Sequence, residues 1–193
     1  MSKEVYVDID GTIRNTCEGI RLYLAKQGYD FNWQNAITYG FDGNIGVDKS
    51  LVYKCFNVKE VYQLSPLFAG AKEAIAMLKA YDYKVFAYTQ SNTTLDVVNF
   101  NTAFIKKLGV ESAIYLHKKP TIETGYAIFD DCIGVLEDWY YETEAKLYLI
   151  DQPYNQKINN PKSSSLWEEI TRCENLYEGV KKFISRECKI TEY

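Results

Sequence analysis

Short runs of β-branched and aromatic residues alternate along the chain with longer stretches in which apolar residues recur at helical spacing. The short runs predict five strands, at residues 4–8, 84–89, 113–117, 127–129 and 147–150. The longer stretches predict helices at residues 13–27, 71–81, 95–108, 133–144 and 176–187. This alternation is typical of a doubly wound, Rossmann-like α/β fold, with helices on both faces of a mostly parallel sheet of about five strands.

Residues 16–66 interrupt the alternation. The segment has the pattern of helices and turns and contains no convincing apolar strand. Because the sequence shows no internal repeat, low-complexity tract or long linker, we expect the segment to pack on the core. The sequence therefore predicts a core domain of residues 1–15 and 67–193, with a small helical insertion at residues 16–66.

Composition and charge narrow the classes of function. The 193 residues carry a net charge of −4, which argues against a broad binding face for duplex nucleic acid or an anionic membrane. No apolar run is long enough to span a bilayer, and the first residues lack the pattern of a signal peptide. The five cysteines form no C-x-x-C pair, so neither a disulfide framework nor a zinc site is indicated. We expect a cytoplasmic protein.

Acidic and hydroxyl residues close three of the predicted strands. Asp8 and Asp10 follow the first strand, Thr89 ends the second, and Asp130 and Asp131 follow the fourth. Ligands of open α/β sheets bind beyond the carboxyl ends of the strands, so these side chains are expected to converge. Carboxylates gathered in this way repel one another unless a hard cation lies between them. Oxygen ligands suit Mg²⁺, which is the predicted cofactor.

The segment Asp8-Ile-Asp10-Gly-Thr at the end of the first strand resembles the signature of the haloacid dehalogenase superfamily, whose other motifs follow in matching order. The resemblance implies that Asp8 is a nucleophile that forms an aspartyl-phosphate. It implies that Asp10 protonates the leaving oxygen and later activates water. The metal ligands that it implies are Asp8, the backbone carbonyl of Asp10, Asp130 and Asp131.

Two further roles follow from the same resemblance. Thr89 matches the hydroxyl residue that binds the phosphoryl group, and a lysine of the segment His117-Lys-Lys-Pro matches the catalytic cation. Lys119 is the choice because it precedes the proline, and Lys118 is the alternative. Taken singly, each of these residues could be an ordinary turn, strand-end or surface residue. Their combination in order favours an enzyme, a phosphoric monoester hydrolase.

Within the superfamily, the chain is most similar to the 5′(3′)-deoxyribonucleotidases. Three segments carry the resemblance, namely Pro66-Leu-Phe-Ala-Gly-Ala, Thr89-Gln-Ser-Asn and Asp151-Gln-Pro-Tyr-Asn, and the last is the most specific. The family pattern is broken at Phe68, Gln90 and Asn92. In this family the insertion at residues 16–66 is a type-one helical cap over the active site, and caps choose substrates. The resemblance therefore implies a 5′-nucleotidase acting on deoxyribonucleotides.

The candidate substrate contacts come from the core and from the insertion. Aromatic residues of the insertion could stack on a nucleobase, although such residues more often form a local core. Phe41 and Phe56 are the choices for the pocket wall because they lie near turns that contain glycine or asparagine. The full set of predicted substrate-binding residues is Gly11, Thr12, Ser91, Lys118, Phe41 and Phe56.

Three other functions stay open at this point. A phosphatase for sugar phosphates or other small phosphomonoesters would keep the same core residues. A catalytically idle nucleotide-binding module would use the same acidic site without turnover. A 3′-phosphatase for nucleic-acid ends would need a basic channel, and the sequence shows no extended cluster of lysine and arginine near the insertion. The preferred base and sugar, the phosphate position and the assembly also stay open, a homodimer included.

Overall fold

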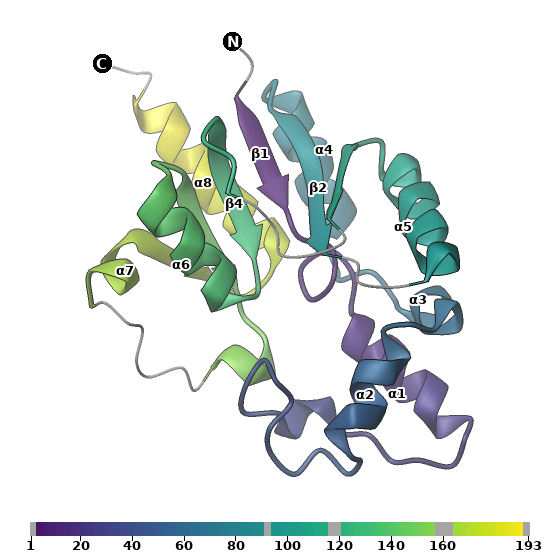
Figure 1. Ribbon diagram of the computed structural model, residues 1–193. Helices are drawn as coiled ribbons and strands as arrows, with labels where there is room; N and C mark the ends of the chain where they lie inside the picture. The colour runs from purple at the N-terminus through teal and green to yellow at the C-terminus, as the bar shows by residue number, and fades with distance from the viewer. Residues whose placement is uncertain (1–2, 91–93, 116–120, 157–163, 191–193) are drawn as a thin grey trace.

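The computed structural model describes residues 3–90, 94–115, 121–156 and 164–190. Within these residues, six strands form a single sheet in the order β3-β2-β1-β4-β5-β6, and every neighbouring pair is parallel (Figure 1). The doubly wound α/β fold is therefore confirmed. The strands are β1 (Glu4–Val7), β2 (Lys84–Gln90), β3 (Glu111–Tyr115), β4 (Gly125–Asp130), β5 (Lys146–Ile150) and β6 (Ile170–Cys173).

Helices cover both faces of the sheet. The first face packs against α4 (Ala71–Ala80), α5 (Leu95–Leu108) and α8 (Leu176–Ile190), and the second against α6 (Ile133–Glu142) and α7 (Ser164–Glu169). Successive side chains of β1 point to opposite faces of the sheet: Val5 and Val7 face the first group of helices, and Tyr6 faces the second. Burial on both faces explains why the strands are nearly continuous apolar runs in the sequence.

Residues 16–66 form helices and turns without a strand, as the sequence predicts. They contain α1 (Thr16–Ala25), α2 (Lys49–Cys55), α3 (Lys59–Leu64) and a 3₁₀ turn, η1 (Trp33–Asn35). These helices lie beyond the carboxyl ends of the strands (Figure 1). Their apolar side chains gather in a separate buried cluster that includes Ile20, Leu24, Phe31 and Val52, and Tyr154 joins that cluster from the segment after β5.

The structure differs from the sequence prediction at several elements, among them β6, α1 and β3. Strand β6, the sixth strand, was not predicted, because its four residues Ile-Thr-Arg-Cys are too few to give a clear pattern. The first helix begins at Thr16 rather than at residue 13, because the Asn15 side chain caps it by accepting a hydrogen bond from the backbone N–H of Glu18 at 3.0 Å. Strand β3 begins at Glu111, two residues before the predicted start.

No helix within the described ranges is both long and apolar enough to cross a membrane.

Candidate active site

Three buried carboxylates meet at the carboxyl ends of β1 and β4. These two strands are neighbours with Val7 opposite Phe129, so the residues that follow them emerge side by side. The backbone N–H of Asp8 donates to the carbonyl of Phe129 at 2.9 Å, which extends the pairing by one residue. Oxygen atoms of Asp8, Asp130 and Asp131 lie within 4.8 Å of one another, and the three residues are at most 4 % exposed.

The donor set suits a hard divalent cation. Three ionised carboxylates at this spacing in a buried place would repel one another strongly, and a cation among them removes that cost. The donors are all oxygen atoms, as Mg²⁺ prefers, and the adjoining cavity leaves room for the water molecules that Mg²⁺ keeps. The residues present therefore fit the predicted Mg²⁺. The side chain of Asp10 is not in this group, and the role of its backbone carbonyl stays a prediction.

Asp131 is held by the segment after β5. The Tyr154 hydroxyl donates to Oδ2 of Asp131 in a short hydrogen bond, and Nδ2 of Asn155 donates to the Asp131 carbonyl at 2.9 Å. Nε2 of Gln152 donates to the carbonyl of Gly11 at 2.7 Å. Burial, and then the negative charge of Asp131, raise the pKa of Tyr154 well above its ordinary value, so its proton stays available for this bond. The Asp-Gln-Pro-Tyr-Asn segment therefore links the loop after β1, which contains Gly11, to the loop after β4, which contains Asp131.

Asp10 lies beside this group but has different partners. Its Oδ1 accepts hydrogen bonds from Nη2 of Arg14 at 2.6 Å, from Nε of Arg14 at 3.1 Å and from Oγ1 of Thr16 at 2.5 Å. Its side chain is 21 % exposed, whereas that of Arg14 is 1 % exposed. In Asp10, therefore, hydrogen bonds fix the position of Oδ1, while the side chain stays partly exposed at the cavity.

A cavity of about 440 Å³ opens over the carboxylates. Thr89, at the end of β2, is 1 % exposed and lines it. The core residues in its wall include Asp8, Asp10, Gly11 and Asp131. Aromatic side chains from residues 16–66 supply much of the facing wall: Tyr39, Phe41, Tyr53, Phe56 and Tyr62.

The predicted site residues fall into three groups. Asp8, Asp10, Gly11, Thr89, Phe41 and Phe56 line the cavity, and Asp130 belongs to the carboxylate group beneath it. Thr12 is fully buried outside the cavity wall, and its Oγ1 has no hydrogen-bond partner within the described part of the chain. Ser91, Lys118 and Lys119 lie outside the described residues. Their predicted roles, like those of the other site residues, remain predictions.

Sequence reasoning gave no role to several residues whose side chains contact the site, and three of them bind its carboxylates. Arg14 and Thr16 bind Asp10, and Tyr154 binds Asp131. Arg14 carried a signal in the sequence, since it is a cation four residues after a candidate catalytic carboxylate. Tyr154 is part of a segment that was singled out only for its resemblance. Tyr154 reaches Asp131 because it lies in a 3₁₀ turn, η2 (Pro153–Asn155), that follows β5.

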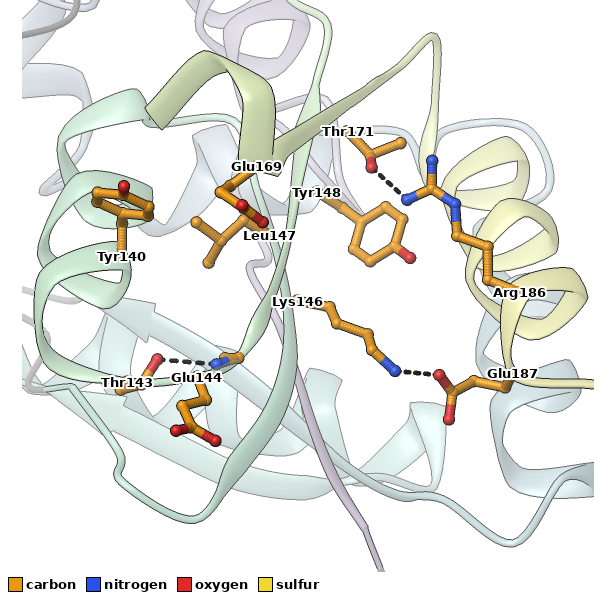
Figure 2. Close-up of a pocket in the computed structure, with 11 residues that line it drawn as sticks. Tyr140, Thr143, Glu144, Lys146, Leu147, Tyr148, Glu169, Thr171, Arg186 and Glu187 are labelled. Atoms are coloured by element: carbon orange, nitrogen blue, oxygen red, sulfur yellow. Dashed lines mark hydrogen bonds and ion pairs between the residues drawn. The ribbon is translucent and has the colours of Figure 1, made fainter. Parts of the chain in front are cut away.

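A second cavity, of about 580 Å³, lies at the opposite end of the sheet, by the start of β5 (Figure 2). Three of its charged side chains, those of Lys146, Arg186 and Glu187, have partners. Lys146 forms an ion pair with Glu187, and Nη1 of Arg186 donates to Oγ1 of Thr171 at 2.7 Å. No group of acidic, histidine or cysteine ligands forms there among the described residues, since the one such group is that of Asp8, Asp130 and Asp131. Among the described residues, the group of carboxylates that could hold a metal ion therefore lies at the smaller cavity.

No family model matches the sequence. No curated protein matches it either. Solved structures do match in fold. A D,D-heptose 1,7-bisphosphate phosphatase from B. bronchiseptica, complexed with magnesium and phosphate, aligns with a TM-score of 0.60 at 12 % identity, covering 95 % of this chain and 99 % of that one.

Two further structures give similar values. A haloacid dehalogenase-like family hydrolase from Xanthomonas campestris aligns with a TM-score of 0.57 at 13 % identity, covering 100 % of this chain and 99 % of that one. A predicted phosphoglycolate phosphatase from Haemophilus somnus aligns with a TM-score of 0.53 at 16 % identity, covering 94 % and 98 %. At such identities the similarity establishes the fold alone, and that fold is the one found in phosphatases of the haloacid dehalogenase superfamily.

Proposed function

We propose that this protein is a Mg²⁺-dependent phosphomonoesterase that works through an aspartyl-phosphate on Asp8. The observation that carries the proposal is the group of Asp8, Asp130 and Asp131, whose oxygens lie within 4.8 Å at the carboxyl ends of adjacent strands. The order of the sequence motifs and the shared fold support it. Asp10, next to this group and open to the same cavity, supplies the second carboxylate that the reaction needs.

The first half of the reaction transfers the phosphoryl group to the protein. A carboxylate oxygen of Asp8 attacks phosphorus, and the bond between phosphorus and the ester oxygen breaks. Asp10 donates its proton to that leaving oxygen, so that an alcohol departs. The Thr89 hydroxyl donates a hydrogen bond to a phosphoryl oxygen, and Lys119 places a positive charge near the same oxygens.

The second half returns Asp8 to its starting state. Asp10, now ionised, removes a proton from a water molecule whose oxygen attacks phosphorus. The acyl-phosphate bond breaks, inorganic phosphate leaves, and Asp10 is again protonated. Asp8, Asp130 and Asp131 are the side chains that would hold Mg²⁺, which when bound offsets the negative charge of the carboxylates and phosphoryl oxygens.

The substrate is a small phosphomonoester, and residues 16–66 act as the cap that selects it. This role is supported by the position of the segment over the acidic site and by the aromatic wall that it contributes to the cavity. The similar structures named above favour sugar phosphates and related small acids, because one is a phosphatase of heptose bisphosphate and another is a predicted phosphatase of phosphoglycolate. None of the three is named as a nucleotidase.

A deoxyribonucleotide is the second candidate substrate. It is favoured by the aromatic rings at the cavity, where Phe41 packs at 6.1 Å from Tyr53 and 6.2 Å from Phe56 between ring centroids. Faces and edges of this kind can bind a flat base. The same rings also pack against one another, as the side chains of a small local core do, and this packing does not favour a nucleobase.

The test is phosphate release from a panel of sugar phosphates, phosphoglycolate, and 5′- and 3′-deoxyribonucleotides, with Mg²⁺ or with EDTA. We expect release that needs Mg²⁺ and is lost in Asp8→Asn by at least about 10³-fold, because the variant lacks the nucleophile. Asp82→Asn is the matched control. It makes the same chemical change in an exposed turn before β2, at the far end of the sheet, and should leave turnover unchanged.

The panel also decides between the two substrate classes. A preference of tenfold or more in kcat/KM for sugar phosphates or for deoxyribonucleotides identifies the class that the cap selects. If the folded wild type releases phosphate from nothing in the panel, the enzymatic proposal is wrong. An idle binding module would then be the better interpretation.

A further inference from the structure

Among the described residues, Arg14 is the most deeply buried cation near the site, with a relative exposure of 1 %. It lies in the loop between β1 and α1, four residues after Asp10. Its Nη2 donates to Oδ1 of Asp10 at 2.6 Å and to Oδ1 of Asn101 at 3.1 Å, and its Nε donates to the same Asp10 oxygen at 3.1 Å. One carboxylate oxygen therefore receives two hydrogen bonds from a single planar group, which fixes its position.

Arg14 is also clamped by aromatic rings from two different helices. The guanidinium carbon lies 4.6 Å from the ring centre of Tyr62 in α3 and 4.9 Å from that of Phe104 in α5. Helix α3 belongs to residues 16–66, whereas α5 belongs to the sheet-bearing part of the chain. The position of the guanidinium is thus set by the packing between these two parts.

Burying the Arg14 guanidinium is unfavourable for the stability of the fold. Nη1 of Arg14 is buried and has no hydrogen-bond partner among the described residues. A buried cation that is incompletely hydrogen-bonded is commonly no more stable than a well-packed apolar side chain of the same volume. A role in the chemistry of its partner gives a reason for keeping the charge.

The two oxygens of Asp10 are in different environments. The hydrogen bonds from Arg14 and from Oγ1 of Thr16 all end on Oδ1, and Oδ2 accepts none within the described ranges. Asp10 also lines the cavity. Fixing Oδ1 on the protein side therefore leaves Oδ2 as the oxygen that can carry a proton to or from a ligand.

We propose that Arg14 is the positioning residue for Asp10. It holds Oδ1 so that Oδ2 faces the leaving oxygen of the substrate and, later, the attacking water. The role rests on the proposed phosphomonoesterase function, because it concerns the proton transfers of that reaction. Arg14 does not touch the substrate in this role and acts through the orientation of the Asp10 carboxylate alone.

The test compares two substrates that share a phosphoryl group and differ in their need for a proton. Nitrophenolate leaves p-nitrophenyl phosphate without being protonated, whereas the more basic phenolate of phenyl phosphate needs the acid. We expect Arg14→Met to lower kcat/KM for phenyl phosphate by roughly 100-fold and for p-nitrophenyl phosphate by less than about 10-fold, in line with the usual size of general acid catalysis. Asp10→Asn should show the same selective loss.

Three further variants separate positioning from folding. Arg14→Lys keeps the charge and should recover part of the activity on phenyl phosphate. Arg21→Met is the matched control, since it removes an arginine whose ion pair with Glu18 lies on the surface of α1, and it should leave both substrates unchanged. In a chain that already carries Asp10→Asn, adding Arg14→Met should cause no further loss on phenyl phosphate, because the two changes remove the same contribution.

Two outcomes overturn the proposal in distinguishable ways. Equal losses of kcat/KM on both substrates, or losses from Arg14→Met and Asp10→Asn that multiply, would make Arg14 a structural residue and leave the proposed function intact. Failure of the folded wild type to release phosphate from either substrate would overturn the proposed function, and the role of Arg14 with it.

Discussion

Gly11 shows how a single residue leaves room for the acidic site. Its φ of +94° lies in the region that favours glycine. A Cβ at this position would overlap the carboxylate of Asp131 and lie 2.7 Å from the Tyr154 hydroxyl. Gly11→Ala should therefore displace Asp131 and lower kcat by about 10-fold or more, besides costing about 2 kcal/mol of stability. Phosphate release and urea unfolding measure the two effects.

Gly28 provides the control for backbone strain. It has a comparable φ of +81°, and nothing lies within 4 Å of the Cβ that alanine would add. Gly28→Ala should cost about 1 kcal/mol for the left-handed conformation and leave kcat unchanged. If the two variants were equally active and equally stable, the overlap with Asp131 would not be a constraint on the site.

At the same scale, the sequence predicts carboxylates better than their partners. The sequence predicts that Asp8, Asp130 and Asp131 lie close together, because the carboxyl ends of parallel strands share one edge of the sheet. The spacing of Asp10 and Arg14 suggests their contact without fixing it, because the contact depends on a turn in which the N–H groups of Ile13 and Arg14 both donate to the carbonyl of Ile9. Such a turn has no periodic pattern.

At the scale of elements, the packing of α1 on α3 depends on Gly19. A Cβ on this residue would overlap the hydroxyl oxygen of Ser65 and lie 2.5 Å from the backbone carbonyl oxygen of Val61. Alanine is the better helix former, so propensity alone predicts that Gly19→Ala stabilises the protein. We expect the reverse, a loss of about 1–3 kcal/mol, because α3 must move away from α1. The measurement is the free energy of unfolding in urea.

Gly134 in α6 is the matched helical glycine. It is exposed, and the nearest atom to an added Cβ is Sγ of Cys132 at 3.9 Å. Gly134→Ala should therefore stabilise the protein by about 0.5–1 kcal/mol, as helix propensity predicts. A stabilising effect of both alanines would show that α1 and α3 are not packed as described.

The elements that the sequence predicted well are those with long, regular patterns. Helix α5 has the predicted bounds, and Gly109 after it has a left-handed φ of +68°, as expected for a helix C-cap. Strand β6 was missed, because a strand of four residues at the edge of the sheet has little apolar pattern. It exists through its pairing with β5, where Leu147 lies opposite Ile170, and such a non-local contact cannot be seen in a local window.

At the scale of the whole molecule, the two ends of the sheet differ in how their charged side chains are arranged. At the carboxyl ends of the strands, carboxylates line a cavity, whereas at the opposite end lysine side chains form ion pairs with Glu187. There Glu187 of α8 accepts hydrogen bonds from Lys3 at 2.9 Å and, at shorter range, from Tyr126 of β4 and Lys146 of β5. One carboxylate thus connects the last helix to the starts of three neighbouring strands.

This network predicts how stability depends on pH. Burial raises the pKa of Glu187, but hydrogen bonds from Lys146, Tyr126 and Lys3 outweigh burial and hold that pKa at about 2, below the ordinary 4.5. A carboxyl whose pKa is lower in the folded state stabilises the protein fully above pH 4.5. That contribution is lost as the pH falls toward 2. The difference corresponds to about 3 kcal/mol at most, and the side chain is 11 % exposed, so water screens it little.

Glu187→Gln tests this prediction, with Glu123→Gln in the exposed turn before β4 as its control. At pH 7 the Glu187 variant should be less stable than wild type by about 2–3 kcal/mol, and the control should differ by less than about 0.5 kcal/mol. Between pH 4.5 and pH 2 the gap between wild type and Glu187→Gln should close, because the wild-type carboxylate becomes protonated. A gap that stayed constant over this range in urea unfolding would mean that the carboxylate is not stabilised by its neighbours, and that packing alone joins α8 to the sheet.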